Sequence, residues 1–157
     1  MKILGLDPGT ATTGFGLVET DNRDYKSIDY GCIKTPSGLD PGSRLLIIKE
    51  DLQTLIDRYQ PDLAVVEDIF FAKNVKTAIQ VGEARGVILA TLAEKGIVTH
   101  SLKPVEIKKA IVGYGHATKK QMQEMVSKIL HLEKPISSDD AADALALCLT
   151  FLQTSGH

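Results

Sequence analysis

The sequence predicts an α/β fold with a single five-stranded sheet of mixed direction, flanked by helices. Three short apolar runs joined by turn-forming residues come first, which is typical of an antiparallel meander. A segment with the apolar spacing of a helix then leads to a fourth apolar run. A crossover of that length allows the fourth strand to lie parallel to one of the first three.

Each predicted element has its own signal in the chain. The first strand ends at the turn-forming pair Pro8-Gly9, and a polar loop at 20–26 separates the second strand from the third. Pro61 ends the first helix, and Gly96 ends the second. The expected strands cover residues 2–7, 14–18, 27–34, 63–67 and 97–100, and the expected helices cover 43–59, 75–95, 104–111, 119–130 and 138–152.

Length and composition exclude several classes of protein. At 157 residues, with 43% hydrophobic and 24% charged residues, the chain has the profile of one globular domain, residues 1–157, and not of a disordered or fibrous protein. Its two cysteines are too few for a disulfide framework or a four-cysteine zinc site, which favours a cytoplasmic location. The longest uncharged run, residues 144–157, is shorter than the roughly 18 apolar residues of a membrane span, so no membrane association is expected.

Charge is unevenly distributed along the chain. The net charge is -2, from 18 basic and 20 acidic residues, which taken alone argues against a polyanionic partner. Residues 1–70 hold 7 basic and 12 acidic residues, residues 71–128 hold 10 and 4, and residues 129–157 hold 1 and 4. The middle of the chain is therefore basic between two acidic ends, a pattern compatible with nucleic acid binding.

Four carboxylates stand where the core or its edge is expected. Asp7 closes the first strand and Glu67 closes the fourth, and a carboxylate near the core must be paired, hydrogen-bonded or metal-bound. Asp140 and Asp143 are three residues apart, so they share one face of the last helix. Each acid also has a possible structural role without catalysis. Asp7 could cap an Asp-Pro-Gly turn, and Glu67, beside Asp68, could be a solvated residue at a strand end. The helix acids could interact favourably with the helix dipole.

Together these acids predict an oxygen-rich metal site. Hard oxygen ligands without His or Cys suit Mg²⁺ or Mn²⁺. Two such ions, as in nucleases and polymerases, would let one generate hydroxide while the other stabilises the leaving oxygen. Cations would also relieve the repulsion between neighbouring carboxylates. The candidate ligands of such a site are Asp7, Glu67, Asp140 and Asp143.

The basic middle segment supplies a candidate nucleic acid interface. Residues 103–120 contain five lysines against one acid, with glycines that allow close approach of a backbone. Phe70 and Phe71, followed by Lys73, are candidates to stack on unpaired bases. The structural alternatives are a solvated helix face for the lysines and a place in the core for the phenylalanines. The five lysines are Lys103, Lys108, Lys109, Lys119 and Lys120.

Five motifs occur in order between Lys2 and about Phe151. They are Ile-Leu-Gly-Leu-Asp-Pro-Gly-Thr with Thr-Gly-Phe-Gly after it, Val-Val-Glu-Asp-Ile-Phe-Phe-Ala-Lys-Asn, Gly-Glu-Ala-Arg-Gly, Val-Gly-Tyr-Gly and Asp-Ala-Ala-Asp-Ala-Leu-Ala. In order and spacing they resemble the RuvC-type Holliday junction resolvases. The resemblance implies an RNase H-like fold and Mg²⁺-dependent, paired nicking of two strands of like polarity in a four-way DNA junction, leaving 5′-phosphate and 3′-hydroxyl ends in recombination and repair.

The resemblance also assigns roles to single residues. It implies that the catalytic acids are Asp7, Glu67, Asp140 and Asp143, the last of which is replaced by His in some members of the family. Phe70 matches the aromatic side chain at the junction centre. Lys108 and Lys119 match the functional basic positions, and the neighbouring Lys109 and Lys120 leave each assignment open by one residue.

The partners that the resemblance implies are junction DNA, a second copy of the chain, and a branch-migration motor of the RuvA and RuvB type. A two-fold symmetric dimer would place two equivalent sites on a roughly two-fold junction. The helix at 75–95 carries small residues that suit either close approach of another helix or packing on its own sheet. These residues are Gly82, Ala84, Gly86 and Ala90.

Three other functions fit parts of the sequence. An RNase H-like nuclease that trims ribosomal RNA precursors would share the acids but lack the Phe-Phe-Ala-Lys-Asn and Val-Gly-Tyr-Gly stretches. A sugar kinase or chaperone-like ATPase shares the Asp-x-Gly-Thr turn but needs two such domains, for which 157 residues are too few. A DNA-binding module without catalysis would have no use for Asp7 and Glu67 together.

Overall fold

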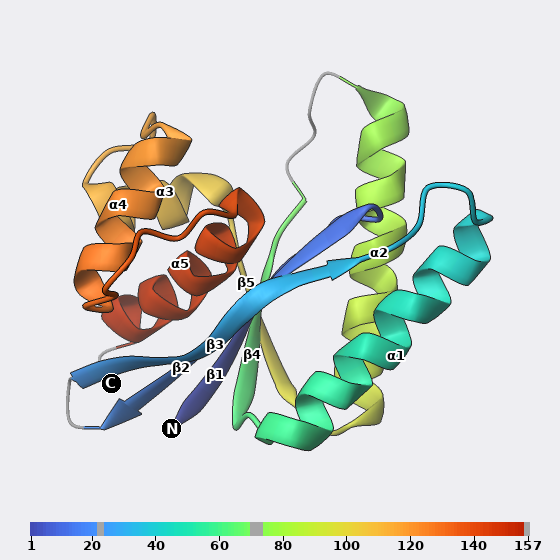
Figure 1. The fold of residues 1–157 in the computed structure, drawn as a ribbon, viewed down its shortest axis with the longest axis horizontal. Helices are drawn as coiled ribbons and strands as arrows, with labels where there is room; N and C mark the ends of the chain where they lie inside the picture. The colour runs from blue at the N-terminus through green and yellow to red at the C-terminus, as the bar shows by residue number, and fades with distance from the viewer. Residues whose placement is uncertain (22–23, 70–73, 156–157) are drawn as a thin grey trace.

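The computed structural model describes residues 1–21, 24–69 and 74–155, and its centre is a five-stranded sheet in the order β3-β2-β1-β4-β5 (Figure 1). Strands β1 to β3 pair antiparallel, β4 pairs parallel with β1, and β5 pairs parallel with β4. The predicted mixed sheet and its crossover are confirmed. The strands are β1 Lys2–Asp7, β2 Thr12–Asp21, β3 Asp24–Lys34, β4 Leu63–Glu67 and β5 Val98–Leu102.

Helices cover both faces of this sheet (Figure 1). Alternate residues of β1 point to opposite faces: Ile3 packs in the core with α5, whereas Leu4 and Leu6 pack in the core with α1 and α2. Within the described part of the chain, no helix is long and apolar enough to cross a membrane. The helices are α1 Pro41–Tyr59 and α2 Val75–Glu94 on one face, and α3 Pro104–Val112, α4 Lys119–Ile129 and α5 Asp139–Thr154 on the other.

Helix α5 lies directly against β1 and β2 because the strand positions beneath it are glycines. A Cβ atom on Gly5 would lie 1.9 Å from the carbonyl oxygen of Ala144. A Cβ atom on Gly14 would lie 2.1 Å from the carbonyl oxygen of Asp140. Any larger residue would lift the helix from the sheet. These glycines therefore bring the start of α5 to the end of β1.

The ends of several helices and strands differ from the sequence prediction. The loop expected at 20–26 is wrong, since β2 continues to Asp21 and β3 begins at Asp24, with those two residues paired across the ladder. Charged residues fit there because a strand needs an apolar side chain on only one of its faces. Helix α1 begins at Pro41, where no amide donor is needed, and Asp40 caps it by accepting the amide of Ser43. Strand β5 begins one residue later and ends two residues later than expected, from Val98 to Leu102.

Candidate active site

The four predicted acids come from three elements that meet at one end of the sheet. Asp7 ends β1 and Glu67 ends β4, and because these strands are parallel neighbours, their final residues lie at the same edge. Asp140 and Asp143 lie in the first turns of α5. Gly14 is the ladder partner of Asp7 and also contacts the backbone of Asp140, so α5 starts beside Asp7. The predicted convergence of the acids is present in the structure.

This crowding of carboxylates shifts their protonation. Several effects together raise the pKa of Asp7 to about 9. The largest is burial, followed by the charge of Glu67 and the hydrogen bond from Asp7 to Glu67, and then by the charges of Asp143 and Asp140. Burial likewise raises the pKa of Asp143 to about 7, with a contribution from the charge of Glu67. The pKa of Glu67 is also raised by burial, although the Asp7 hydrogen bond and the charge of Lys108 oppose the shift. Without a cation, Asp7 therefore holds a proton that it donates to Glu67.

The raised pKa values predict that the protein loses stability with rising pH when no metal is present. The unfolded chain releases the Asp7 proton near pH 4, whereas the folded protein keeps it until about pH 9. The unfolding free energy therefore falls across this window, and we expect a loss of about 1 to 3 kcal/mol between pH 6 and pH 8. Asp7→Asn, which is neutral in both states, should remove most of this dependence. Urea unfolding with a chelator at both pH values measures it, and an equal loss in both proteins would contradict the assignment.

The turn and cap hydrogen bonds next to these acids involve neighbouring residues, while Asp140 lies in the first turn of α5, where the helix dipole favours an acid. The amide of Gly9 in the turn after β1 donates to the hydroxyl of Thr13 at 3.4 Å. Ser138, and not Asp140, caps α5 by accepting the amide of Ala141. The carboxylate of Asp68, next to Glu67 in the chain, accepts the amide of Ile69 at 3.0 Å. The local backbone contacts are thus made by other residues.

A cavity of about 220 Å³ joins the acids to the basic segment. Its polar lining consists of Glu67, Asp143, Lys108 and Lys119, and its apolar lining comes from α3, α4 and the segment between them. Lys108 is half-buried there, whereas its neighbour Lys109 is exposed. Lys119 also lines the cavity and donates to Asp139 at 3.1 Å. In each lysine doublet, it is the first member that faces the acids.

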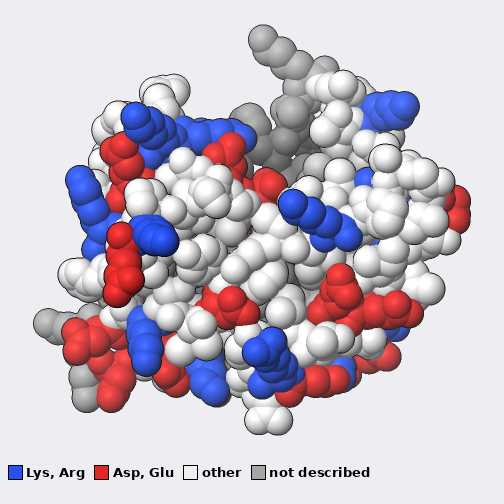
Figure 2. All heavy atoms as spheres, in the orientation of Figure 1, with Lys and Arg blue, Asp and Glu red and all other residues white. Residues whose placement is uncertain are grey.

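The second members of the doublets have other surroundings. Lys109 lies in the last turn of α3, and Lys120 lies 4.0 Å from Glu124 one helical turn later. Figure 2 shows basic side chains gathered over the α3 and α4 end of the molecule, next to acidic ones toward its middle. Phe70, Phe71 and Lys73 lie outside the described residues.

Two residues with contacts at this end of the sheet were not predicted as functional. Asp139, in the first turn of α5, accepts hydrogen bonds from Lys119 and, at 2.6 Å, from Gln123. Arg85 contacts the ends of β4 and β5 from α2. Both residues contact partners that are distant in the sequence, so the residues around them do not predict these contacts. Arg85 does lie within the Gly-Glu-Ala-Arg-Gly motif.

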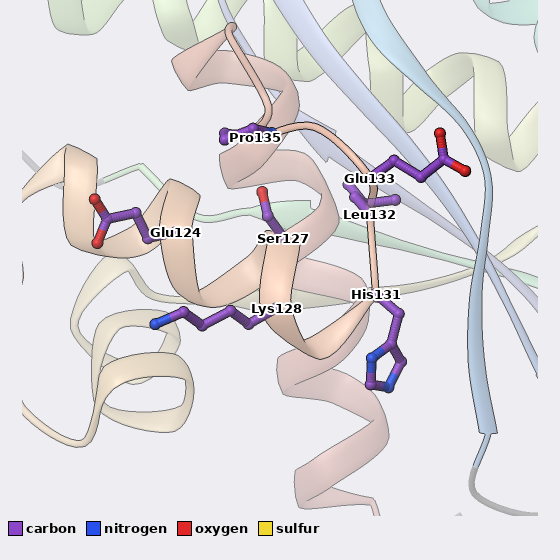
Figure 3. A pocket seen from close by; sticks show the side chains of 7 residues that line it. All are labelled: Glu124, Ser127, Lys128, His131, Leu132, Glu133 and Pro135. Atoms are coloured by element: carbon purple, nitrogen blue, oxygen red, sulfur yellow. The ribbon is translucent and has the colours of Figure 1, made fainter.

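A larger cavity of about 550 Å³ lies elsewhere, at the end of α4 and the segment after it (Figure 3). Its charged lining carries both signs, because Glu124 and Glu133 stand with Lys128 around an open hollow. None of the predicted site residues lines it. The candidate active site is therefore the smaller cavity at the acids.

The sheet order and the carboxylates at the ends of β1 and β4 define a nuclease of the RNase H-like class. The family model for "Crossover junction endodeoxyribonuclease RuvC" matches residues 3–151. The protein of that name from Chloroflexus aurantiacus is 49% identical over 155 residues, covering 99% of this chain and 94% of the relative. The chain belongs to the RuvC family of crossover junction endodeoxyribonucleases.

Solved structures agree with this assignment. The structure described as T. thermophilus RuvC in complex with Holliday junction substrate has a TM-score of 0.92 and 29% identity, covering 99% of this chain and 94% of that one. The Holliday junction resolvase of fowlpox virus has a TM-score of 0.62 at 17% identity, which shows the shared fold alone.

Proposed function

We propose that this protein resolves four-way DNA junctions by nicking two strands of like polarity, as part of homologous recombination and DNA repair. The observation that carries the proposal is the cavity in which Glu67 and Asp143 face Lys108 and Lys119. Carboxylates suit activation of a nucleophile, and lysines beside them suit a phosphodiester backbone. Hydrolysis in line would leave a 5′-phosphate and a 3′-hydroxyl that a ligase can seal.

The chemistry of the acids fits divalent cations. In the described residues no three His, Cys, Asp or Glu side chains already form a metal site, and Asp7 instead shares a proton with Glu67. The donors are nevertheless all carboxylate oxygens, as Mg²⁺ and Mn²⁺ prefer. Repulsion between the carboxylates contributes to the raised pKa of Asp7, and a bound cation would relieve this repulsion. We propose that Asp7, Glu67, Asp140 and Asp143 would hold two Mg²⁺ ions, which Mn²⁺ can replace.

We assign a separate role in cleavage to each group of residues at the site. Bound cations supply activation of water and neutralise charge on the phosphate. Asp7 must release its proton for the site to reach its full negative charge, so activity should rise as pH increases. Lys108 and Lys119 would stabilise negative charge that develops on the phosphate in the transition state. Phe70 and Lys73 follow the site in sequence and would contact the junction.

The test of this function compares substrates with the wild-type protein. A synthetic four-way junction, a plain duplex of the same sequence and an RNA hairpin are each incubated with and without Mg²⁺. We expect paired, ligatable nicks in the junction only, and only with the cation. Cleavage of the RNA hairpin in preference to the junction would favour a ribosomal RNA precursor nuclease. Junction binding without any cleavage would favour the alternative function, a DNA-binding module without catalysis.

We also propose that two copies pair through the outer face of α2. Of the small residues on this helix, Ala84 is buried and Gly82 lies beside Ile69, whereas Gly86 and Ala90 are exposed. The outer face also exposes large apolar side chains, with Val75 73% and Ile79 57% exposed. They line a cleft of about 440 Å³ between α2 and the start of α1. Exposed apolar side chains beside a cleft are typical of a protein interface.

Ile79→Lys is therefore expected to shift the protein from dimer to monomer. A charge at the centre of an apolar interface is costly to bury, so we expect the dissociation constant to rise at least about tenfold. Sedimentation over a concentration series measures this. Val98→Lys is the matched control, because Val98 is 61% exposed at the start of β5, just beyond the end of α2 that lies opposite to Ile79. The interface lies elsewhere if Ile79→Lys sediments like the wild type.

Three further proposals follow from the same family membership. Residues 1–157 would act as one nuclease domain, since β1 and α5 come from distant parts of the chain and pack together. A branch-migration motor of the RuvA and RuvB type would deliver the junction. The protein would work in the cytoplasm, where the DNA of such recombination lies.

A further inference from the structure

Arg85 on α2 connects three groups at the ends of β4 and β5. Its Nε donates to the carbonyl oxygen of Glu67 at 3.1 Å, and one terminal nitrogen donates to the hydroxyl of Ser101 at 2.8 Å. The same nitrogen lies 3.4 Å from a carboxylate oxygen of Asp68. The side chain of Arg85 is only 18% exposed. A guanidinium in this position is a structural link and not a surface charge.

The backbone that Arg85 contacts is the point at which the chain leaves the sheet. Beyond Glu67, the amide of Asp68 continues the ladder by donating to the carbonyl of Leu102 at 2.8 Å. Ile69 then packs close to Gly82, one turn before Arg85 on α2. Helix α2 thus fixes the direction of the chain on both sides of the Glu67 backbone.

We propose that Arg85 is a positioning residue that holds Glu67 in the geometry required for cleavage, an inference that rests on the proposed nuclease function. By fixing the carbonyl of Glu67, Arg85 restricts rotation of the backbone that carries the carboxylate toward Asp7. By pairing with Asp68, it also keeps that neighbouring acid away from the site. Lys cannot replace it, because an ammonium lacks the planar set of donors that reaches the Glu67 carbonyl and Ser101 together.

The test measures cleavage and backbone protection in the same variants. For Arg85→Ala and Arg85→Lys we expect kcat on a synthetic junction to fall about 10- to 100-fold, as for other misplaced catalytic groups, with KM changed less than about threefold. Amide hydrogen exchange at Asp68, measured without a divalent cation, should become at least about tenfold faster. Guanidinium ion added to the alanine variant should restore part of kcat.

The matched control is Arg58→Ala, which removes an arginine that stacks on Tyr59 at the distant end of α1 and should change neither quantity. A wild-type kcat in Arg85→Ala, a full restoration by Arg85→Lys, or a change confined to KM would overturn the proposal. If the alanine variant does not fold, the lysine variant carries both measurements. If the wild type does not cut the junction but exchange at Asp68 responds, the nuclease function fails while the restraint by Arg85 stands.

Discussion

Asp7→Asn should abolish cleavage of a four-way junction while leaving junction binding nearly unchanged. Asp7 stands at the centre of the carboxylate cluster, where Glu67, Asp140 and Asp143 all act on its pKa. An amide keeps the size and one oxygen of the side chain but cannot become an anionic ligand, so we expect kcat to fall at least about 100-fold. Single-turnover cleavage and an electrophoretic binding assay measure the two effects separately.

A matched control removes a carboxylate of the same strand pair at its opposite end. Asp62 accepts the amide of Lys2 at 2.7 Å, and Asp62→Asn keeps an oxygen that can accept this bond. Its cleavage should equal that of the wild type. Full activity of Asp7→Asn with Mg²⁺ would refute the mechanism, and loss of junction binding would show that Asp7 serves the interface instead.

Gly14→Ala should damage stability and activity together. Its Cβ would lie 2.1 Å from the carbonyl oxygen of Asp140 and 2.5 Å from the carbonyl carbon, and both are backbone atoms that no side-chain rotation can move. The start of α5 must therefore shift. We expect a loss of about 3 kcal/mol in unfolding free energy, at the upper end for overpacking, or about 6 to 12 °C in melting temperature.

Activity in Gly14→Ala has to be measured well below its melting temperature. There the protein is folded, but Asp140 and Asp143 are displaced from Asp7, so kcat should still be reduced. Gly38→Ala is the matched control, because a Cβ atom on Gly38 meets nothing within 4 Å. A variant of Gly14 with normal stability and normal kcat would show that α5 does not depend on this close contact.

The arrangement of the acids could be predicted from the sequence because it follows from strand direction. Asp7 and Glu67 each close an apolar run, and a helical crossover between them makes the two strands parallel. Parallel strands end at the same edge, so the two carboxylates had to meet. Asp140 and Asp143 were identified by their spacing on one helix.

Other features of the site depend on tertiary packing and could not be predicted. Lys108 and Lys109 are adjacent on a helix and differ by about 100° around its axis, so only the docking of α3 decides which one faces Glu67. The role of Gly14 likewise depends on a helix far away in the chain. Arg85 could not be assigned because each of its partners belongs to another element.

The contact of α5 with β1 has a consequence for synthesis of the protein. Asp7 leaves the ribosome long before Asp140 and Asp143, and the thiol of Cys148 in α5 donates to the carbonyl of Ile3 in β1. A nascent chain can pair β1 with β4 long before α5 emerges. It then has two of the four acids, and under the proposed mechanism it would not cut DNA. Under the proposed mechanism, nuclease activity would therefore begin only when translation has delivered α5.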